Sequence, residues 1–330
     1  LWQLPKPVAR PALRPLTLRK PKRRSGVGAR RIALTIQGRK GLNTSCFPLT
    51  TGIPLPSGHL YDARRAELLD SARRPIPVQV RVNGLWPDGS VRWLLVDFQH
   101  DVGSDDRAVT LRYGREVPRV ARGKPLATET KGGVQVDTGS ATLLVPKDGL
   151  FLPGRVQLSD GTTVVGNGAK GGIRLRTADR KVYRSSGKVD SIEVLEAGSQ
   201  RAVVKVAYRH FDSRGNAMFR SEAHIHAYAG KAWFRVSYTF INDNTTAEFT
   251  NVRDLTLSTP LVSRPEKDTS VSQHFDNHFT LWEDGQRKRE GRRYNGLLLA
   301  KTKVGTCAVA VRNFWQNYPK ALTLGRRGVE

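Results

Sequence analysis

The sequence predicts an all-β protein, and three observations support this. Apolar residues recur mostly at every second position, as in Val78, Val80 and Val82, which is the spacing of a half-buried strand. Turn-forming Gly, Pro, Asp and Asn separate the short runs. No long segment has the 3.6-residue periodicity of an amphipathic helix. At 330 residues the chain is expected to hold about two domains of roughly 100–200 residues each.

The first 31 residues form a basic, Pro-rich segment. They contain ten Lys or Arg, five Pro and no acid, in a chain whose net charge is +26. Such a segment has too little apolar surface to fold alone, so residues 1–31 are predicted to be an extended arm that docks on a neighbouring subunit or, alternatively, on nucleic acid. Trp2 is its only aromatic residue, which argues against stacking recognition of single strands. The residues expected to bind the partner are Lys6, Arg10, Arg14, Arg19, Lys20, Lys22, Arg23 and Arg24.

Residues 32–122 are predicted to form a small β-barrel. Strands are expected at 31–37, 66–70 and 108–113, and 47–60 is expected to be a Pro-rich loop, since Pro excludes a central strand. The hairpin PIPVQVRVNGLWPDGSVRWLLVDF, residues 75–98, turns at Pro87-Asp88-Gly89. Trp86 and Trp93 flank this turn and are predicted to serve as core or capping residues of the barrel.

Residues 123–318 are predicted to form an antiparallel β-sandwich, because turns recur every 8–12 residues or so. Residues 319–330 are expected to be a linker or a truncated end. The predicted strands of the sandwich are Val134–Asp137, Ala141–Val145, Arg155–Leu158, Ile173–Arg176, Ser191–Leu195, Arg201–Arg209, Ala217–Tyr228, Ala232–Ile241, Phe249–Ser258, Phe279–Glu283, Gly296–Ala300 and Cys307–Val311.

Four motifs give the chain a family resemblance. They are FPLTTGIPLPSG (47–58), PIPVQ (75–79), WPDGSVRW (86–93) and FWQNYPKAL (314–322). With these motifs in this order, the chain resembles the exo-rhamnogalacturonan lyase-like family. The resemblance implies a RIFT-type β-barrel, then a larger β-sandwich, then a catalytic α/α toroid that would begin shortly after the FWQNYP segment.

The chain ends at Glu330, and the catalytic groups of the family are associated with the toroid. Lyase chemistry needs a cation beside the uronate carboxylate and a base for the C5 proton. The resemblance assigns neither role to a residue of this chain. The expected function is therefore a non-catalytic carbohydrate-associated module that binds acidic polysaccharide outside the cytoplasm. A structural subunit of a larger homo-oligomeric assembly is the alternative.

Glu222, His224 and His226 alternate with Ala223, Ile225 and Ala227, so they project from one face of a strand. Two histidines at this spacing, with a carboxylate, resemble part of a metal site or an acid–base pair. A polar, solvated sheet face gives the same pattern and no further ligand is identified, so neither a metal nor a cofactor is predicted.

A second candidate site lies near the C-terminus. QHFDNHF, residues 273–279, contributes His274, Asp276 and His278, which are residue types that bind sugar hydroxyls. The basic run QRKREGRR, residues 286–293, contributes Lys288, Arg292 and Arg293 and is expected to be a solvated loop that could hold an acidic glycan. A loop ordered by its own aromatic residues is the simpler alternative.

Cys46 and Cys307 are far apart in the sequence, and two buried free thiols are favoured over a disulfide. No apolar run approaches the roughly 18 residues that a membrane span needs.

Overall fold

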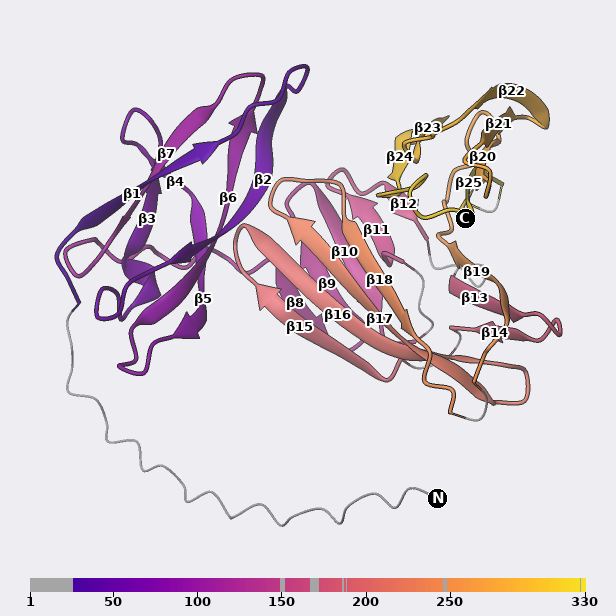
Figure 1. The fold of residues 1–330 in the computed structure, drawn as a ribbon, viewed down its shortest axis with the longest axis horizontal. Coiled ribbons are helices and arrows are strands. Elements are labelled where there is room, and N and C mark those ends of the chain that lie inside the picture. Colours follow the sequence, from indigo (N-terminus) through magenta and orange to yellow (C-terminus); the bar gives the residue numbers. More distant parts are fainter. Residues whose placement is uncertain are drawn as a thin grey trace, which may run out of the picture. The chain divides into compact units, whose positions relative to one another are not determined.

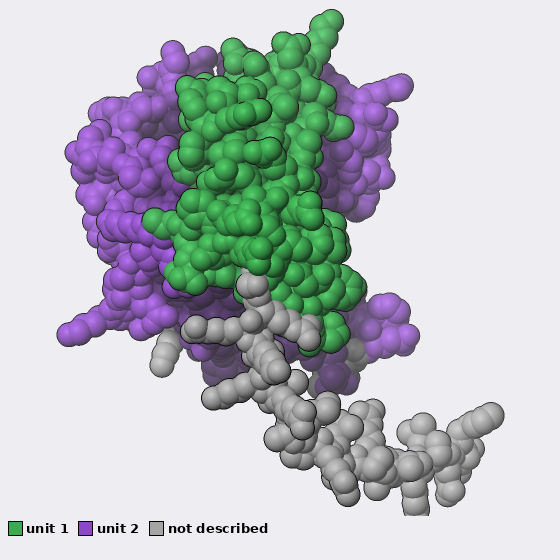
Figure 2. Space-filling model, turned by 90° about the vertical axis from the view of Figure 1, so that its left-hand side faces the viewer, with its two compact units in different colours: residues 1–121 green, residues 122–330 purple. Residues whose placement is uncertain are grey.

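The computed structural model describes residues 26–148, 152–166, 172–185, 187, 189–245, 248–326 and 328–330. The arm residues Lys6 to Arg24 lie outside this part of the chain. What is described is all-β, as predicted, with one 3-10 turn at Ala63–Arg65. It forms two compact units, residues 1–121 and 122–330, coloured separately in Figure 2. No helix within the described part is long and apolar enough to span a membrane.

Unit 1 is the predicted barrel (Figure 1), built from two antiparallel sheets whose strand orders are β1-β7-β3-β4 and β2-β6-β5. Leu68, Leu94 and Leu111 are fully buried between them. The alternation of apolar and polar residues in the sequence therefore places one face of each sheet in the core. The strands are β1 (Arg30–Ile36), β2 (Thr44–Pro54), β3 (Ala66–Leu69), β4 (Pro75–Ile76), β5 (Val78–Leu85), β6 (Val91–Val102) and β7 (Arg107–Tyr113).

The segment predicted as a Pro-rich loop is largely strand β2. Pro48 and Pro54 lie within it. β2 pairs only with β6 and forms an edge of its sheet, so these prolines sit where a missing N–H is tolerated. The sequence excluded a central strand correctly, but the interpretation as a loop was wrong.

The Pro-Asp-Gly turn is tied to the preceding loop through Asp88. One carboxylate oxygen accepts hydrogen bonds from the N–H (2.9 Å) and the hydroxyl (2.6 Å) of Ser90. The other accepts from the hydroxyls of Ser57 and Tyr61, each at 3.0 Å. These bonds, those from Ser90 above all, hold the pKa of Asp88 well below its ordinary value. Ser90 is fully buried and accepts from the N–H of Gly58 at 2.9 Å.

Unit 2 contains the predicted sandwich. A five-stranded sheet, β12-β11-β10-β9-β8, faces a second sheet in which β18-β17-β16-β14-β13-β19 are consecutive and β15 pairs with β16. The bounds are β8 (Ala127–Thr130), β9 (Gly133–Asp137), β10 (Ala141–Pro146), β11 (Arg155–Leu158), β12 (Thr163–Val165), β13 (Gly172–Thr177), β14 (Val182–Arg184), β15 (Ser191–Ala197), β16 (Arg201–Phe211), β17 (Ala217–Tyr228), β18 (Arg235–Ile241) and β19 (Val252–Ser258).

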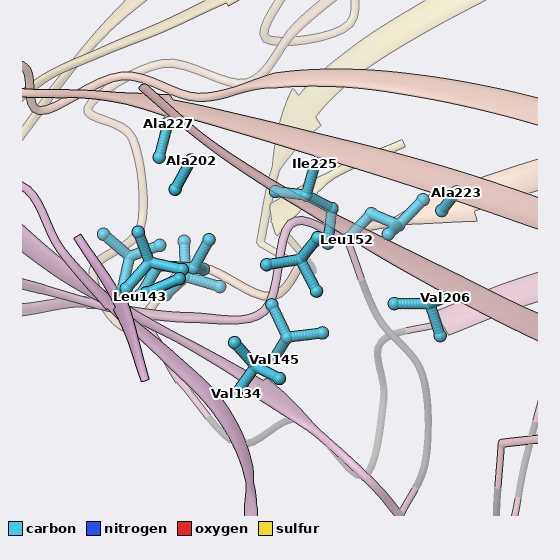
Figure 3. Close-up of a cluster of buried hydrophobic side chains, with 14 of the residues drawn as sticks. Val134, Leu143, Val145, Leu152, Ala202, Val206, Ala223, Ile225 and Ala227 are labelled. Carbon is cyan, nitrogen blue, oxygen red and sulfur yellow. The ribbon is translucent and has the colours of Figure 1, made fainter. Parts of the chain in front are cut away.

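The sandwich core lies between the two sheets. Figure 3 shows Leu143 and Val145 of β10 facing Val206 of β16 and Ile225 of β17. Each of these side chains is at most 1% exposed. The odd-numbered residues of β17 therefore fill the core, and the predicted row Glu222, His224 and His226 lies on the opposite face.

The last part of unit 2 has its own sheet and core. Its sheet has the order β22-β21-β20-β25-β26, and a β23-β24 hairpin accompanies it. Val271, Phe314 and Leu324 form the centre of its core. The basic run expected to be a solvated loop is mainly edge strand β22, so that expectation was wrong. The bounds are β20 (Thr269–Gln273), β21 (Phe279–Glu283), β22 (Gln286–Gly291), β23 (Leu297–Thr302), β24 (Gly305–Ala310), β25 (Lys320–Gly325) and β26 (Gly328–Val329).

Both cysteines are free thiols. Cys307 is half-buried, and burial raises the pKa of its thiol. Cys46 is exposed, so the prediction of two buried thiols was wrong for this residue, which lies at a bulge in edge strand β2.

Candidate functional site

Three segments that are distant in sequence meet at one end of the β20–β22 sheet. They are the turn His274–His278 between β20 and β21, residues 292–296 after β22, and residues 314–319 before β25. Gln273, which is 1% exposed, joins the first two. Its Nε2 donates to the carbonyl oxygens of His278 and Arg292, both at 3.2 Å, and its Oε1 accepts from the N–H of Tyr294 at 3.2 Å.

Aromatic stacking brings in the third segment. The ring of Tyr294 lies 6.0 Å from that of Phe314 and 5.2 Å from that of Phe279, centroid to centroid. Burial raises the pKa of the Tyr294 hydroxyl. We call the group of exposed and partly exposed side chains that results the convergent-loop surface. It consists of His274, Phe275, Asp276, His278, Arg292, Arg293, Trp315 and Tyr318.

Two aromatic side chains of this surface are exposed to solvent. Phe275 is 74% exposed and Tyr318 is 42% exposed. Their rings meet edge to face, with centroids 5.9 Å apart. The guanidinium carbon of Arg293 lies 4.4 Å from the ring centroid of Trp315, which is within cation–π range.

The predicted polar residues of the second candidate site are mostly close together here. Asp276 accepts a hydrogen bond from the N–H of His278 at 3.0 Å. Nε2 of His278 lies 4.0 Å from a carboxylate oxygen of Glu290. Arg292 and Arg293 are exposed, and neither forms an ion pair with a described residue. Lys288 lies further along β22, where its Nζ donates to Oε1 of Gln286 at 3.1 Å.

The first candidate row occupies the outer face of β17, on a different sheet. Glu222 forms an ion pair with Lys205 of β16, in which Nζ and Oε1 are 3.1 Å apart. His226 lies between two guanidinium groups. Nη2 of Arg201 is 3.3 Å from its Nδ1, and Nη2 of Arg235 is 3.5 Å from its Nε2.

Burial, followed by the charges of Arg235 and Arg201, lowers the pKa of His226 to about 4. A metal ion would need several ligands in one place. Over the part of the chain that the structure describes, no three His, Cys, Asp or Glu residues gather closely enough to hold one.

The two tryptophans of the hairpin differ. Nε1 of Trp86 donates to the carbonyl of Leu55 at 2.8 Å, and the guanidinium of Arg92 covers its ring at 4.8 Å. Trp93 is 42% exposed and lies beside Gly84, whose Cβ would be 3.6 Å from the indole Cδ1. Trp86 is thus half-buried and held within unit 1, whereas Trp93 does not enter the core.

The sequence did not reveal two of these relationships. Nothing in the spacing connects Phe275 with Tyr318, because they meet only through the folding of the terminal sheet. Arg201 and Arg235 were also missed as neighbours of His226. Arg235 could have been found by registering β18 against β17, where it lies directly opposite His226.

The fold and the site define a class: a two-domain β-protein with a small barrel followed by a sandwich. Residues 37–109 match the PcRGLX-like N-terminal RIFT barrel domain, and residues 126–267 match the PcRGLX-like protein central beta sandwich domain. The chain belongs to the PcRGLX-like family, and the predicted rhamnogalacturonan lyase-like resemblance is confirmed. The convergent-loop surface, residues 274–318, lies beyond the matched segments.

The relatives are longer than this chain. It is 27% identical over 171 residues to the uncharacterized protein YetA of Bacillus subtilis (strain 168), a match covering 49% of this chain and 19% of YetA. Among solved structures it is similar to a glycosyl hydrolase family 38 protein from Enterococcus faecalis, with a TM-score of 0.46 and 11% identity over 86% of this chain and 40% of that one. An alpha-mannosidase from Enterococcus faecalis V583 gives a TM-score of 0.42 and 10% identity, over 92% and 43% of the two chains.

Proposed function

We propose that this chain is a carbohydrate-associated β-module that binds acidic polysaccharide through the convergent-loop surface. The observation that carries the proposal is the exposed aromatic pair Phe275 and Tyr318, whose rings meet edge to face. Family membership supports the carbohydrate class, since the two matched domains are those at the front of rhamnogalacturonan lyase-like proteins.

The side-chain chemistry suits an acidic sugar. An exposed aromatic ring offers an apolar face on which the C–H face of a sugar ring can stack. Arg292 and Arg293 offer guanidinium forks, which bind carboxylates in a bidentate manner. His274 and Asp276 add polar groups at the edge of the aromatic pair, where sugar hydroxyls would lie.

The charge of the chain favours the same ligand. At a net charge of +26, a polyanion is attracted over the whole surface and its encounter with the site is accelerated at low salt. The alternative partners, a neighbouring subunit or nucleic acid, depend on the basic arm, of which residues 1–25 lie outside the described part of the chain. Those alternatives stay predictions, as does location outside the cytoplasm.

Equilibrium binding to polygalacturonate tests the proposal. The combined variant Phe275→Ala and Tyr318→Ala should bind about tenfold more weakly than the intact chain, because two contact residues are removed. Phe249→Ala is the matched control, since Phe249 is 76% exposed and Phe275 is 74% exposed. A neutral galactan should bind weakly to all variants.

Equal polygalacturonate affinity in the double variant and the control would contradict the proposal. A separate assay for the absorbance of unsaturated uronate products tests lyase activity in the same samples. The non-catalytic interpretation predicts no product from this chain alone.

A further inference from the structure

A row of side chains crosses the outer face of the β15–β18 sheet. Val203 of β16 lies directly opposite both Glu196 of β15 and His226 of β17, and His226 lies opposite Arg235 of β18. Directly opposed side chains in neighbouring strands are about 5 Å apart at Cβ. The buried Val203, which is 3% exposed, places an apolar side chain between Glu196 and His226 in this row.

Two guanidinium donors approach a single imidazole in this row. Arg201 and Arg235 both approach His226, at 3.3 Å and 3.5 Å. A guanidinium only donates, and a neutral imidazole accepts at a single nitrogen. One of the two arginine contacts therefore lacks an acceptor on the imidazole.

The charges are unequal as well. Arg201 has an ion pair with Glu196, with the side-chain atoms 3.7 Å apart. Arg235 forms no ion pair with any described residue. Arg235 therefore brings a positive charge to His226 with which a bound anion would pair.

An aromatic surface adjoins these arginines. Tyr228 lies directly opposite Arg201 in the β16–β17 register. Its ring centroid is 5.0 Å from that of Trp233, and Trp233 is 43% exposed. Trp233 and Arg235 flank Phe234, which packs against the sandwich core, so both are on the outer side of the sheet.

We propose that Arg201, His226 and Arg235 form a binding site for the carboxylate of a single sugar acid, with its ring stacked on Trp233. The two guanidiniums would each donate to the carboxylate, and the imidazole N–H would complete the set. This site is separate from the convergent-loop surface and does not need that surface to bind polymer.

Binding should be linked to the protonation of His226. The ionisable groups that face it across the sheet are Glu193, Glu196, Arg201, Lys205, Glu222, His224 and Arg235. In the free protein burial, followed by the charges of Arg235 and Arg201, disfavours the protonated imidazole. A bound carboxylate adds a negative charge beside the ring and favours the protonated form, so it should raise the pKa of His226 from about 4.

Titration of the intact chain with galacturonate, galactose and acetate tests this inference. The readouts are affinity by calorimetry and the imidazole resonance of His226 by NMR, assigned with His226→Gln. Galacturonate should bind and raise the pKa of His226. Galactose should fail to bind, and acetate should bind more weakly than galacturonate because it does not stack on Trp233.

Arg235→Gln is the decisive variant. Arg235 is exposed and lacks an ion pair, so its loss should leave the fold intact while weakening galacturonate binding about tenfold, the amount expected for a hydrogen bond to a charged group. Arg214→Gln, in the exposed turn between β16 and β17, is the matched control and should bind normally.

Equal galacturonate affinity in Arg235→Gln and Arg214→Gln, or equal binding of galactose, would overturn the site. Failure of this site is distinguishable from failure of the polysaccharide proposal. The Phe275→Ala and Tyr318→Ala variant should bind polygalacturonate about tenfold more weakly but retain galacturonate binding at His226.

Discussion

The two best-defined motifs of this chain, WPDGSVRW in unit 1 and FWQNYPKAL in unit 2, use their polar and aromatic residues in opposite ways. In the first motif Asp88 accepts hydrogen bonds from Ser90, Ser57 and Tyr61 within its own unit. In the second motif Tyr318 points to solvent and meets Phe275. A motif that identifies a family can therefore be a structural connection in one place and an accessible surface in another.

The two motifs differ because the polar groups of the first are already hydrogen-bonded within unit 1. The first motif connects two loops, the one ending in Pro56-Ser57-Gly58 and the hairpin turn, and few polar atoms are left for a ligand. Around the second motif, the buried Gln273 forms hydrogen bonds with backbone groups of His278, Arg292 and Tyr294. The exposed side chains are then available for binding.

The largest expected effect is on the stability of unit 1. Trp86→Ala removes a half-buried indole and its hydrogen bond to Leu55, so it should lower the free energy of unfolding by about 3 kcal/mol. Trp93→Ala, in the same hairpin, should cost less than about 1 kcal/mol because its ring is exposed. Hydrogen exchange of β5 and β6 would measure both, and equal costs would refute the distinction between the two tryptophans.

The next effect is on the terminal sheet. Gly296 has a φ of +73°, and an added Cβ would lie 2.5 Å from Cβ of Phe314. Gly296→Ala should therefore destabilise this sheet by about 2 kcal/mol. It should also weaken polygalacturonate binding, since Phe314 supports the convergent-loop surface. Gly285→Ala is a control with open space around its Cβ and a φ of +77°, and it reports the backbone cost alone. Equal destabilisation in the two variants would exclude the steric contribution.

A smaller effect is expected from charge. Replacing Arg292 and Arg293 together by Gln should weaken polygalacturonate binding about threefold to tenfold at low salt, because exposed charges are partly screened. The difference from the intact chain should shrink as salt is added. A difference that does not depend on salt would indicate that these arginines act through packing.

A further expected effect is a pH dependence of stability. The pKa of His226 is about 4 in the folded chain and 6.5 ordinarily, so the unfolded chain binds the proton more readily between these values. The contribution of His226 to stability should therefore be present above about pH 6.5 and be lost as the pH falls to about 4. His210 shifts in the same direction because it is buried.

Melting temperatures of the intact chain and His226→Gln, measured from pH 7 to pH 4.5, would test this dependence. The slope should be shallower in the variant, with the remaining dependence due partly to His210. Identical slopes would show that His226 is not held neutral by its surroundings.

Much of the fold was predictable from the sequence. The alternation in Val78, Val80 and Val82 and the turn at Pro87 to Gly89 predicted β5, β6 and their connection, because the strand period and turn chemistry are local properties. β2 was missed, since two prolines are compatible with a strand only at an edge, and edge position depends on the whole sheet. β22 was missed for a related reason: its row of exposed charges resembles a loop.

The candidate site was predictable only in parts. His274, Asp276, His278, Arg292 and Arg293 were chosen from residue type, and the fold brings them together. Their aromatic companion Tyr318 was not identified from the sequence, because sequence spacing cannot show which side chain remains exposed. The pairing of His226 with two arginines likewise requires the register of three strands.

The affinity for polygalacturonate of the Phe275→Ala and Tyr318→Ala variant, compared with Phe249→Ala, tests the central claim most directly. The account predicts about a tenfold loss in the double variant, with the folded state retained and the control unchanged. Equal affinity in the two proteins would contradict the assignment of the convergent-loop surface as the polysaccharide-binding site.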